Sequence, residues 1–128
     1  MDAAGRRGRR RGRLSRSADF DRVYREGRSH ASRYLIVYSF PRAGIDEPRL
    51  GVSVGRKVGG AVDRNRVKRL LREGFWAHAD ELPADRDFVI VARPDIATLA
   101  EERGGTGVEQ ELRAVLASAG ITAAGDQP

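Results

Sequence analysis

The stretch GVSVGRKVGGAVDRNRVKRLLREGFW, residues 51–76, decides the fold of this chain. Its beginning, residues 51–54, predicts a short strand, and the glycine-rich residues 55–60 predict a turn. A helix is expected to follow, from Ala61 or Val62 to Ala77. At about 100° per residue, one side of that helix collects residues suited to a core. These residues are Val67, Leu70, Leu71, Gly74 and Phe75.

The other side of the same helix is almost entirely basic. Its residues are Arg64, Asn65, Lys68, Arg69 and Arg72. A helix that had only to be soluble would mix signs to gain ion pairs between residues four apart. Because only Glu73 interrupts the positive charge, we expect a polyanion to relieve the repulsion, and we favour this over an ordinary solvated face. Arg56 and Lys57 extend the patch, and the glycines around them would let a phosphate backbone approach.

Length and composition fit a single domain of modest size. The chain has 128 residues, enough to bury a core without metals, and it has no cysteine for a disulfide or a thiolate site. No apolar run approaches the ~18 residues of a membrane helix, and the charged N-terminus lacks the apolar segment of a signal peptide. We therefore expect a cytoplasmic protein without membrane contact.

The net charge of +6 conceals an uneven distribution along the chain. Residues 1–76 hold 20 Lys+Arg against 8 Asp+Glu, whereas residues 77–128 hold 4 against 10. Nearly all the basic residues are arginines, whose planar guanidinium matches phosphate and stacks on bases. We expect the first part to face nucleic acid and the second part to form an ordinary solvated surface.

The N-terminal region predicts an arm followed by a helix. Residues 1–13 contain GRRGRRRGR and are expected to be a disordered basic arm. Two roles stay open for it: a solubilising tail, or an arm that adds phosphate contacts independent of sequence. A helix is predicted over Ser17–Glu26, with Ser17 as its N-cap and Gly27 at its end.

Aromatic residues recur on this helix and on the strand that follows it. Phe20 and Tyr24 lie on one helical face, and the predicted strand Ser32–Phe40 carries Tyr34 and Tyr38 on one side. The spacing leaves two interpretations open. The rings are either part of the core, or they are platforms on which bases stack.

The rest of the chain predicts two strands and two helices. The strand Arg49–Val54 is expected to pair antiparallel with the preceding strand, and residues 88–92 (FVIVA) predict a strand buried on both faces. A short helix over Asp95–Glu102 and a glycine-rich connector over 103–107 should precede a last helix that begins with Thr106 and Glu109 as a capping box. The core residues of that last helix are expected to be Val108, Leu112, Val115 and Leu116.

The predicted fold is α+β in the order α-β-β-β-α-β-α, with a four-stranded sheet covered mainly on one side by helices; three of the four strands are assigned to the residues given above. The single domain is expected to span residues 14–118, and residues 119–128 are expected to be a frayed tail. The general rule would give the strand–helix–strand unit over 51–92 a right-handed crossover.

The sequence offers no set of residues for catalysis or metal binding. His30 and His78 lie in unrelated elements, and neither has a second histidine or a cysteine at metal-ligand spacing. No pair of carboxylates stands out as an acid and a base, and Ser53 is not in a GxSxG pattern. We therefore expect no catalytic and no metal-ligating side chain, which disfavours a nuclease that acts alone.

From Leu14 to about Ser118 the chain resembles the bacterial ribonuclease P protein subunit. Lys57, the glycines at 59 and 60, and the run Arg64-Asn65-Arg66-Val67-Lys68-Arg69 carry the resemblance, with fixed spacing through Arg72 and Phe75. The family implies a left-handed crossover within residues 51–92. It also implies a protein that does not cleave, whose RNA partner uses bound Mg²⁺ to remove the 5′ leader of precursor tRNA.

The resemblance assigns roles to two groups of residues. Contact with the catalytic RNA carries over to Arg64, Asn65, Arg66, Lys68, Arg69 and Arg72, flanked by Arg56 and Lys57. A cleft for the single-stranded leader carries over to Phe20, Tyr24, Ser29, Ser32, Ile36 and Tyr38. The rings would then be partly exposed stacking platforms, which suits leaders of variable sequence. The implied partners are ribonuclease P RNA and precursor tRNA, and no protein oligomer is required.

Three positions depart from the family pattern. Ser32 stands where a larger amide is common, Gly60 where asparagine is frequent, and Tyr24 where phenylalanine is often found. The first weakens a base-reading contact in the cleft, and the second removes a polar contact from the turn. The alternative function is that of a ribosomal-type or general RNA-binding protein of the same fold, which would need the basic helix but not the aromatic residues.

Overall fold

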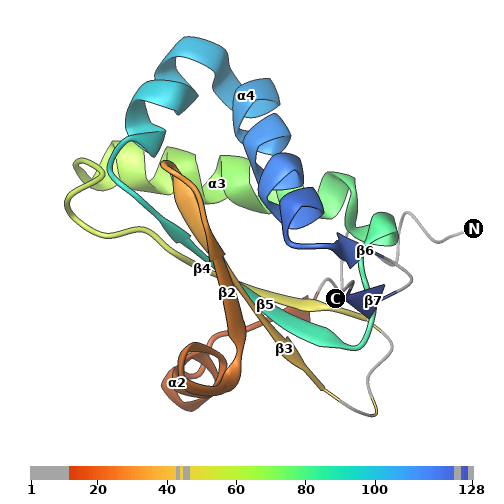
Figure 1. Ribbon diagram of the computed structural model, residues 1–128. Coiled ribbons are helices and arrows are strands. Elements are labelled where there is room, and N and C mark those ends of the chain that lie inside the picture. Colours follow the sequence, from red (N-terminus) through yellow and green to blue (C-terminus); the bar gives the residue numbers. More distant parts are fainter. Residues whose placement is uncertain (1–11, 43, 45–46, 123–124, 127–128) are drawn as a thin grey trace, which may run out of the picture.

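The computed structural model describes residues 12–42, 44, 47–122 and 125–126 (Figure 1). The strands are β1 (Gly12–Arg13), β2 (Arg28–Ala31), β3 (Leu35–Pro41), β4 (Arg49–Ser53), β5 (Arg86–Ala92), β6 (Ile121–Thr122) and β7 (Gly125–Asp126). The helices are α2 (Ser17–Glu26), α3 (Ala61–Ala77) and α4 (Ile96–Ser118), with one 3-10 turn, η1 (Ala79–Glu81). The fold is therefore α+β, and the predicted order α-β-β-β-α-β-α runs from α2 to α4.

The main sheet has five strands in the order β1-β4-β5-β3-β2. The predicted number of four was wrong because Gly12 and Arg13, expected in the disordered arm, pair in parallel with β4 as strand β1. Residues 1–11 of that predicted arm lie outside the described residues. The predicted strand Ser32–Phe40 begins later, at Leu35, because Ser32 lies in the turn of the β2–β3 hairpin.

Strand β5 occupies the centre of the sheet. It pairs antiparallel with β3, where Val37 lies opposite Ile90, and parallel with β4, where Leu50 lies opposite Phe88. The predicted antiparallel pair of β3 with β4 was therefore wrong, since β5 lies between them. After β4, helix α3 returns the chain so that β5 runs parallel to β4 and fills the place between β4 and β3.

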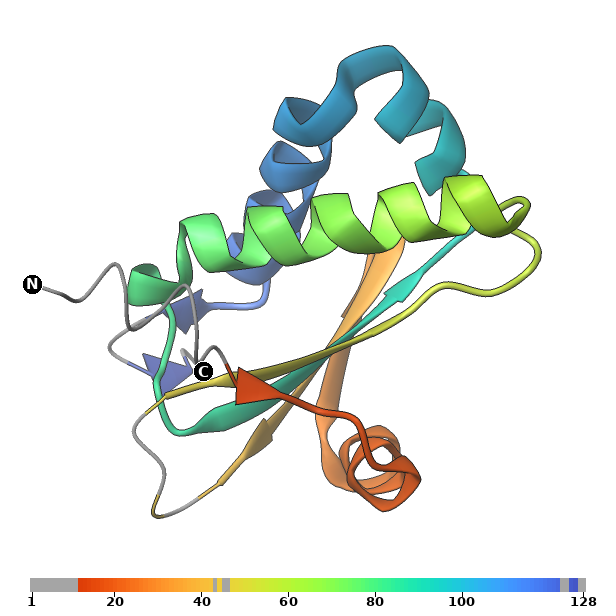
Figure 2. The same ribbon diagram turned by 180° about the vertical axis from the view of Figure 1, so that it is seen from behind.

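Helices cover both faces of the sheet but unequally (Figures 1 and 2). Helices α3 and α4 lie on one face, and α2 lies on the other. The alternation of side chains along β5 follows this division: Phe88 and Ile90 belong to the main core with α3 and α4, whereas Val89 packs with Leu14 and Val23 on the α2 side. The prediction that this strand is buried on both faces is confirmed.

Helix α3 agrees with the amphipathic pattern of its sequence. The predicted core residues Val67, Leu70, Leu71, Gly74 and Phe75 are all buried. A Cβ added at Gly74 would lie 3.3 Å from Cα of Glu109, so glycine allows α3 and α4 to cross closely. The helix starts after Gly60, its N-cap, and Asp63 lies in the first turn instead of capping it.

Helix α4 joins the two helices that the sequence predicted separately. It runs over Ile96–Ser118 with a kink at Gly104, whose φ of 60° and ψ of −152° are not helical. Glycine tolerates this positive φ, which explains why the predicted connector contains the bend. The predicted core residues Val108, Leu112, Val115 and Leu116 are all buried.

The ends of two other elements differ from expectation. Helix α2 has the predicted bounds, but its N-cap is Arg16, which makes no side-chain capping hydrogen bond. Ile121 lies in the segment expected to fray, yet it is buried in the main core, and Ile121–Thr122 pairs with Gly125–Asp126. Burial of the Ile121 side chain explains why the chain is held against the core here.

Among the residues described, no helix has the length and apolar character needed to cross a membrane.

A buried ion pair ties the start of β4 to the start of β5. Asp87 is only 2% exposed, and both its carboxylate oxygens accept hydrogen bonds from Arg49, with Nε and Nη2 each at 2.8 Å. Arg42 lies 3.6 Å from the same carboxylate, and Arg49 also approaches Asp19 of α2 at 3.9 Å. The hydrogen bonds to Asp87 raise the pKa of Arg49. The pair therefore connects three elements that sequence proximity does not connect.

We predict that Arg49→Ala lowers the free energy of unfolding by about 3 kcal/mol, because it leaves the Asp87 carboxylate buried without its main partner. Urea denaturation followed by circular dichroism measures this loss. Arg25→Ala is the matched control, because the pair of Arg25 with Glu26 is exposed and 3.6 Å long. Its effect should stay within about 0.5 kcal/mol. Equal losses in the two variants would contradict a structural role for the Arg49–Asp87 pair.

Candidate RNA interface

One side of α3 carries a row of basic side chains that are partly buried yet unpaired. Arg64, Lys68 and Arg72 follow one another at intervals of four residues, and each is half-buried. No carboxylate of the described residues lies within ion-pair distance of any of the three. The Nε of Arg64 is buried and has no hydrogen-bond partner among those residues. The row therefore holds positive charge that no carboxylate of the described residues neutralises.

Strand β1 lies beside β4 at the edge of the sheet (Figure 2) and carries a further arginine close enough to act on this row. Arg13 lies at the edge of the sheet, in the strand beside β4, and its positive charge acts on Arg72. The pKa of Arg72 is lowered, first because burial disfavours the charged form and then because Arg13 repels it. Two guanidinium groups from different elements thus face the same region, which is suited to a phosphate between or beside them.

The other predicted RNA-contact residues of α3 divide into two groups. Asn65 and Arg69 are exposed on the helix surface, and Arg69 has a loose pair with Glu73 at 3.5 Å. Arg66 lies on the side of α4, where its Nη2 donates a hydrogen bond to the carbonyl oxygen of Ala100 at 3.2 Å. The structure therefore brings together Arg64, Asn65, Lys68, Arg69 and Arg72, and it places Arg66 in a contact between helices.

The turn before α3 presents two more cations to solvent. Arg56 and Lys57 are exposed, and backbone hydrogen bonds from Val58 to Gly55 and from Gly59 to Arg56 hold the turn. A Cβ added at Gly55 or Gly60 would meet no atom within 4 Å. Packing within the protein therefore does not demand glycine at these two positions, which is compatible with the predicted approach of a phosphate backbone.

On the opposite face of the sheet, three aromatic rings form a cluster between α2 and β3. We call Phe20, Tyr24 and Tyr38 the aromatic cluster. The ring centroids of Phe20 and Tyr24 are 6.1 Å apart, and those of Tyr24 and Tyr38 are 5.0 Å apart in an edge-to-face arrangement. Tyr24 is 38% exposed, and the other two rings are partly buried. The cluster therefore belongs partly to the small core and partly to the surface.

Residues of the sheet set the position of this cluster. A Cβ added at Gly51 would lie 2.5 Å from Cζ of Phe20, so this ring sits directly on the backbone of β4. Burial raises the pKa of Tyr24, while a hydrogen bond with the side chain of Ser53 in β4 acts in the opposite direction. Residues of β4 therefore contact two rings of the cluster, Phe20 and Tyr24.

The remaining residues of the predicted leader cleft lie in β2 and β3. Ser29 is paired with Tyr38, so the exposed serine and the ring share one face of the sheet. Ile36 is paired with Val91 and lies on that face as well. Among the six predicted residues, the structure thus brings together Phe20, Tyr24, Ser29, Ile36 and Tyr38.

Ser32 is separated from this group. Its hydroxyl oxygen accepts hydrogen bonds from the backbone N–H groups of Tyr34 at 3.1 Å and Leu35 at 3.4 Å, which stabilises the hairpin turn. It also lines a small hollow with Glu111 and Val115 of α4, on the other face of the sheet. The alternation of side chains along the β2–β3 hairpin explains the separation.

Sequence reasoning missed three residues that the structure adds to these surfaces: Arg13, Gly51 and Ser53. Arg13 had been assigned to the disordered arm, and only its pairing with β4 shows that it faces Arg72. Gly51 and Ser53 are two residues apart in β4, and this spacing predicts that they lie on one face of the strand. It does not predict that Phe20 and Tyr24 lie next to them. Within the part of the chain that the structure describes, no three His, Asp or Glu residues are grouped closely enough to hold a metal ion.

Comparison with known proteins identifies relatives of one kind. The family model described as Ribonuclease P matches residues 9–120. A ribonuclease P protein component from Halalkalibacterium halodurans is 45% identical over 91 residues, which are 71% of this chain and 76% of the relative.

Solved structures agree with that result. The chain is similar to the RNase P protein of Staphylococcus aureus with a TM-score of 0.76 and 35% identity, over 85% of this chain and 95% of the other. The RNase P protein of Thermotoga maritima gives a TM-score of 0.74 and 33% identity, over 83% and 96% of the two chains.

We predict that Arg72→Gln stabilises the free protein by roughly 0.5 kcal/mol at low ionic strength, because it relieves the burial of a charged group and removes the repulsion from Arg13. The part of the gain that comes from repulsion should disappear at about 1 M salt, where exposed charges are screened. Arg69→Gln is the control with the opposite sign, since it removes a pair with Glu73 four residues later and should cost roughly 0.3 kcal/mol. Urea denaturation at both salt concentrations measures the two effects. A loss of stability in Arg72→Gln at low salt would contradict the proposed repulsion.

Proposed function

The chain belongs to the ribonuclease P protein family as a protein component of this tRNA-processing ribonucleoprotein, and from that membership we propose how its surfaces divide the work. The basic side of α3, together with Arg13, Arg56 and Lys57, binds the catalytic RNA. The aromatic cluster on the other face of the sheet binds the single-stranded 5′ leader of precursor tRNA. The protein thereby promotes removal of the leader, and the RNA subunit performs the cleavage.

The observation that carries this proposal is the half-buried row of Arg64, Lys68 and Arg72, which has no carboxylate partner in the part of the chain that the structure describes. Burying cations without partners is unfavourable, so a row of them is understandable where an external polyanion supplies the partner. Phosphates of a folded RNA meet this requirement, and guanidinium groups bind them through parallel hydrogen bonds. Asn65 is the neutral member of the surface, suited to a base edge or a 2′-hydroxyl.

The aromatic cluster suits a leader of variable sequence, because every base has a π-face that stacks on an aromatic ring. The exposure of Tyr24 and the exposed hydroxyl group of Ser29 beside Tyr38 support this role. Ser32 takes no part in our proposal, since its hydroxyl is engaged in the hairpin turn. Arg66 contributes mainly by holding α3 against α4, although its charge adds to the field of the basic surface.

We place the chemistry on the RNA. Mg²⁺ would be held mainly by RNA phosphates, and the protein residues bind and orient the two RNAs. The cytoplasm, where precursor tRNA is processed in bacteria, is the proposed location. We also propose that the β4–α3–β5 crossover is left-handed, as the resemblance implies.

Two alternatives compete with this proposal. A ribosomal-type or general RNA-binding protein would use the basic side of α3 but would not need the partly exposed aromatic cluster. A nuclease acting alone would need a carboxylate cluster for metal, and the described residues contain none.

Reconstitution tests the proposal directly. The full-length protein is combined with the candidate ribonuclease P RNA of the same source at low Mg²⁺, and release of the 5′ leader from precursor tRNA is measured. We expect cleavage only when both components are present. Cleavage by RNA-free protein would overturn the assignment of chemistry to the RNA, and tight RNA binding without stimulation would favour the general RNA-binding alternative.

We predict that single substitutions separate the two surfaces. Arg64→Ala should weaken binding of the catalytic RNA and reduce the dependence of its affinity on salt by about one ion. Tyr38→Ala should preserve that binding but lower the affinity of the holoenzyme for precursor tRNA relative to mature tRNA by roughly 1–3 kcal/mol, because one stacked base is lost. Filter binding of the catalytic RNA to the protein measures the first effect, and filter binding of precursor and mature tRNA to the holoenzyme measures the second. If Tyr38→Ala impaired assembly as much as Arg64→Ala, the proposed division of the surfaces would be wrong.

A further inference from the structure

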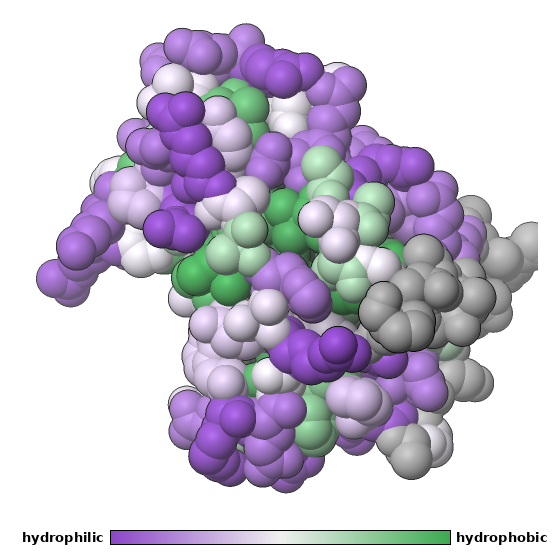
Figure 3. All heavy atoms as spheres, viewed as in Figure 1, coloured by the Kyte–Doolittle hydropathy of each residue, from purple (hydrophilic) through white to green (hydrophobic). Residues whose placement is uncertain are grey.

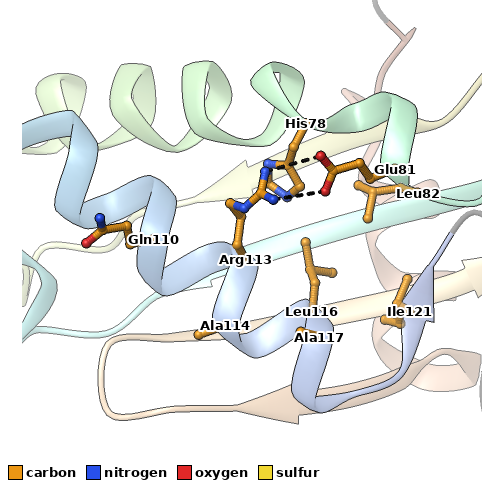
Figure 4. Close-up of a pocket in the computed structure, with 9 residues that line it drawn as sticks. All are labelled: His78, Glu81, Leu82, Gln110, Arg113, Ala114, Leu116, Ala117 and Ile121. Atoms are coloured by element: carbon orange, nitrogen blue, oxygen red, sulfur yellow. Dashed lines mark hydrogen bonds and ion pairs between the residues drawn. The ribbon is translucent and has the colours of Figure 1, made fainter.

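A cavity of about 450 Å³ lies where the end of α3 and η1 meet the second half of α4 (Figure 4). Its walls include the apolar side chains of Leu82, Leu116 and Ile121, and its polar residues include His78, Glu81 and Arg113. The volume falls in the range of sites that bind small molecules. None of the lining residues belongs to the basic surface or to the aromatic cluster.

The hydrogen bonding of His78 defines what this cavity can recognise. The residue is 4% exposed, and its Nδ1 lies 2.8 Å from the carbonyl oxygen of Gly74. A carbonyl oxygen only accepts, so Nδ1 carries the hydrogen and Nε2 of the neutral ring has a free lone pair. Burial lowers the pKa of His78 and outweighs the hydrogen bond to the Gly74 carbonyl, which raises it. Arg113 adds to the lowering, whereas Glu81 and Glu109 oppose it. The neutral ring therefore prevails at neutral pH.

The Nε2 atom is a buried acceptor without a donor. No group of the described residues makes a hydrogen bond to it. A buried polar atom left in this state is unfavourable, and a ligand that supplies a donor recovers that energy. The apolar walls would cover the rest of such a ligand. The site therefore combines one directional polar contact with an apolar enclosure, the usual composition of a small-molecule site.

The rim of the cavity limits the charge of the ligand. Arg113 and Glu81 form an ion pair of 3.1 Å beside His78, and both side chains are about half exposed (Figure 4). Because this pair neutralises itself, the rim attracts neither a strong anion nor a strong cation. Nε2 has almost no accessible surface in this arrangement, so a ligand reaches it only when a neighbouring side chain turns aside. Arg113 is the exposed side chain beside it, so our proposal includes a displacement of Arg113 on binding. Hydrophobic residues also reach the surface at the centre of the face shown in Figure 3.

We propose that this cavity binds a small neutral aromatic molecule whose N–H group donates a hydrogen bond to Nε2 of His78. The site is separate from both RNA surfaces and does not depend on the proposed division between them. Its recognition rests on one donor and a flat apolar body, which distinguishes it from a nonspecific apolar groove.

Indole and benzofuran form a matched pair of probes, because they have almost the same shape and only indole has an N–H donor. Each is titrated into the full-length protein and followed by two-dimensional NMR. We expect shifts centred on residues that line the cavity and an affinity for indole roughly tenfold above that for benzofuran. The Nε2 nitrogen resonance of His78 should move with indole and not with benzofuran. Equal affinities, an unmoved Nε2 resonance, or shifts located elsewhere would overturn the proposal.

Two variants sharpen this test. His78→Phe should bind indole and benzofuran with equal affinity, because the ring volume stays and the acceptor is lost. Ala117→Leu adds volume at the wall of the cavity and should weaken both probes while the acceptor remains. If His78→Phe fails to fold, the Nε2 resonance of the unmodified protein still decides between the outcomes. Unchanged binding of both probes by Ala117→Leu would contradict the assigned site.

Discussion

The alternation of side chains along β5 is the constraint on which the rest of the molecule depends. This strand lies at the centre of the sheet, so each of its residues must be suited to one of two different covers. Phe88 and Ile90 meet the large layer formed by α3 and α4, whereas Val89 meets the single helix α2. A shift of one residue in the pairing would exchange these faces and expose the larger side chains to the smaller cover. Arg49 and Asp87 lie opposite each other in the pairing of β4 with β5, so their two hydrogen bonds favour this register.

The two faces of the sheet separate two kinds of chemistry. On the α3 side, the surface carries arginines and a lysine that repel one another. On the α2 side, it carries aromatic rings that pack together. Strand β4 connects the two, because it pairs with β1, which carries Arg13, and also supports Phe20 through Gly51. The two surfaces therefore lie on opposite faces of the sheet but share one strand as their support.

The structure also shows that one residue type does different work in different places. Arg49 stabilises the fold through a buried carboxylate, Arg66 holds two helices together, and Arg64 has no carboxylate partner among the described residues. Counting arginines in the sequence treats these three alike. What distinguishes them is the presence of an acceptor, which depends on elements far away in the chain. The unpaired arginines are therefore the informative ones for binding.

By itself, the sequence determined the helix α3, its division into an apolar and a basic side, the core face of the last helix and the buried strand β5. These features depend on local periodicity, and the residues that produce them are neighbours on one element. The resemblance to a known family added the roles predicted for the two surfaces. Tertiary structure alone decided the insertion of β5 between β3 and β4, the addition of β1, the position of Arg13 beside Arg72, and the separation of Ser32 from the rings. Each of these depends on pairing between segments distant in sequence, where no local pattern specifies the partner.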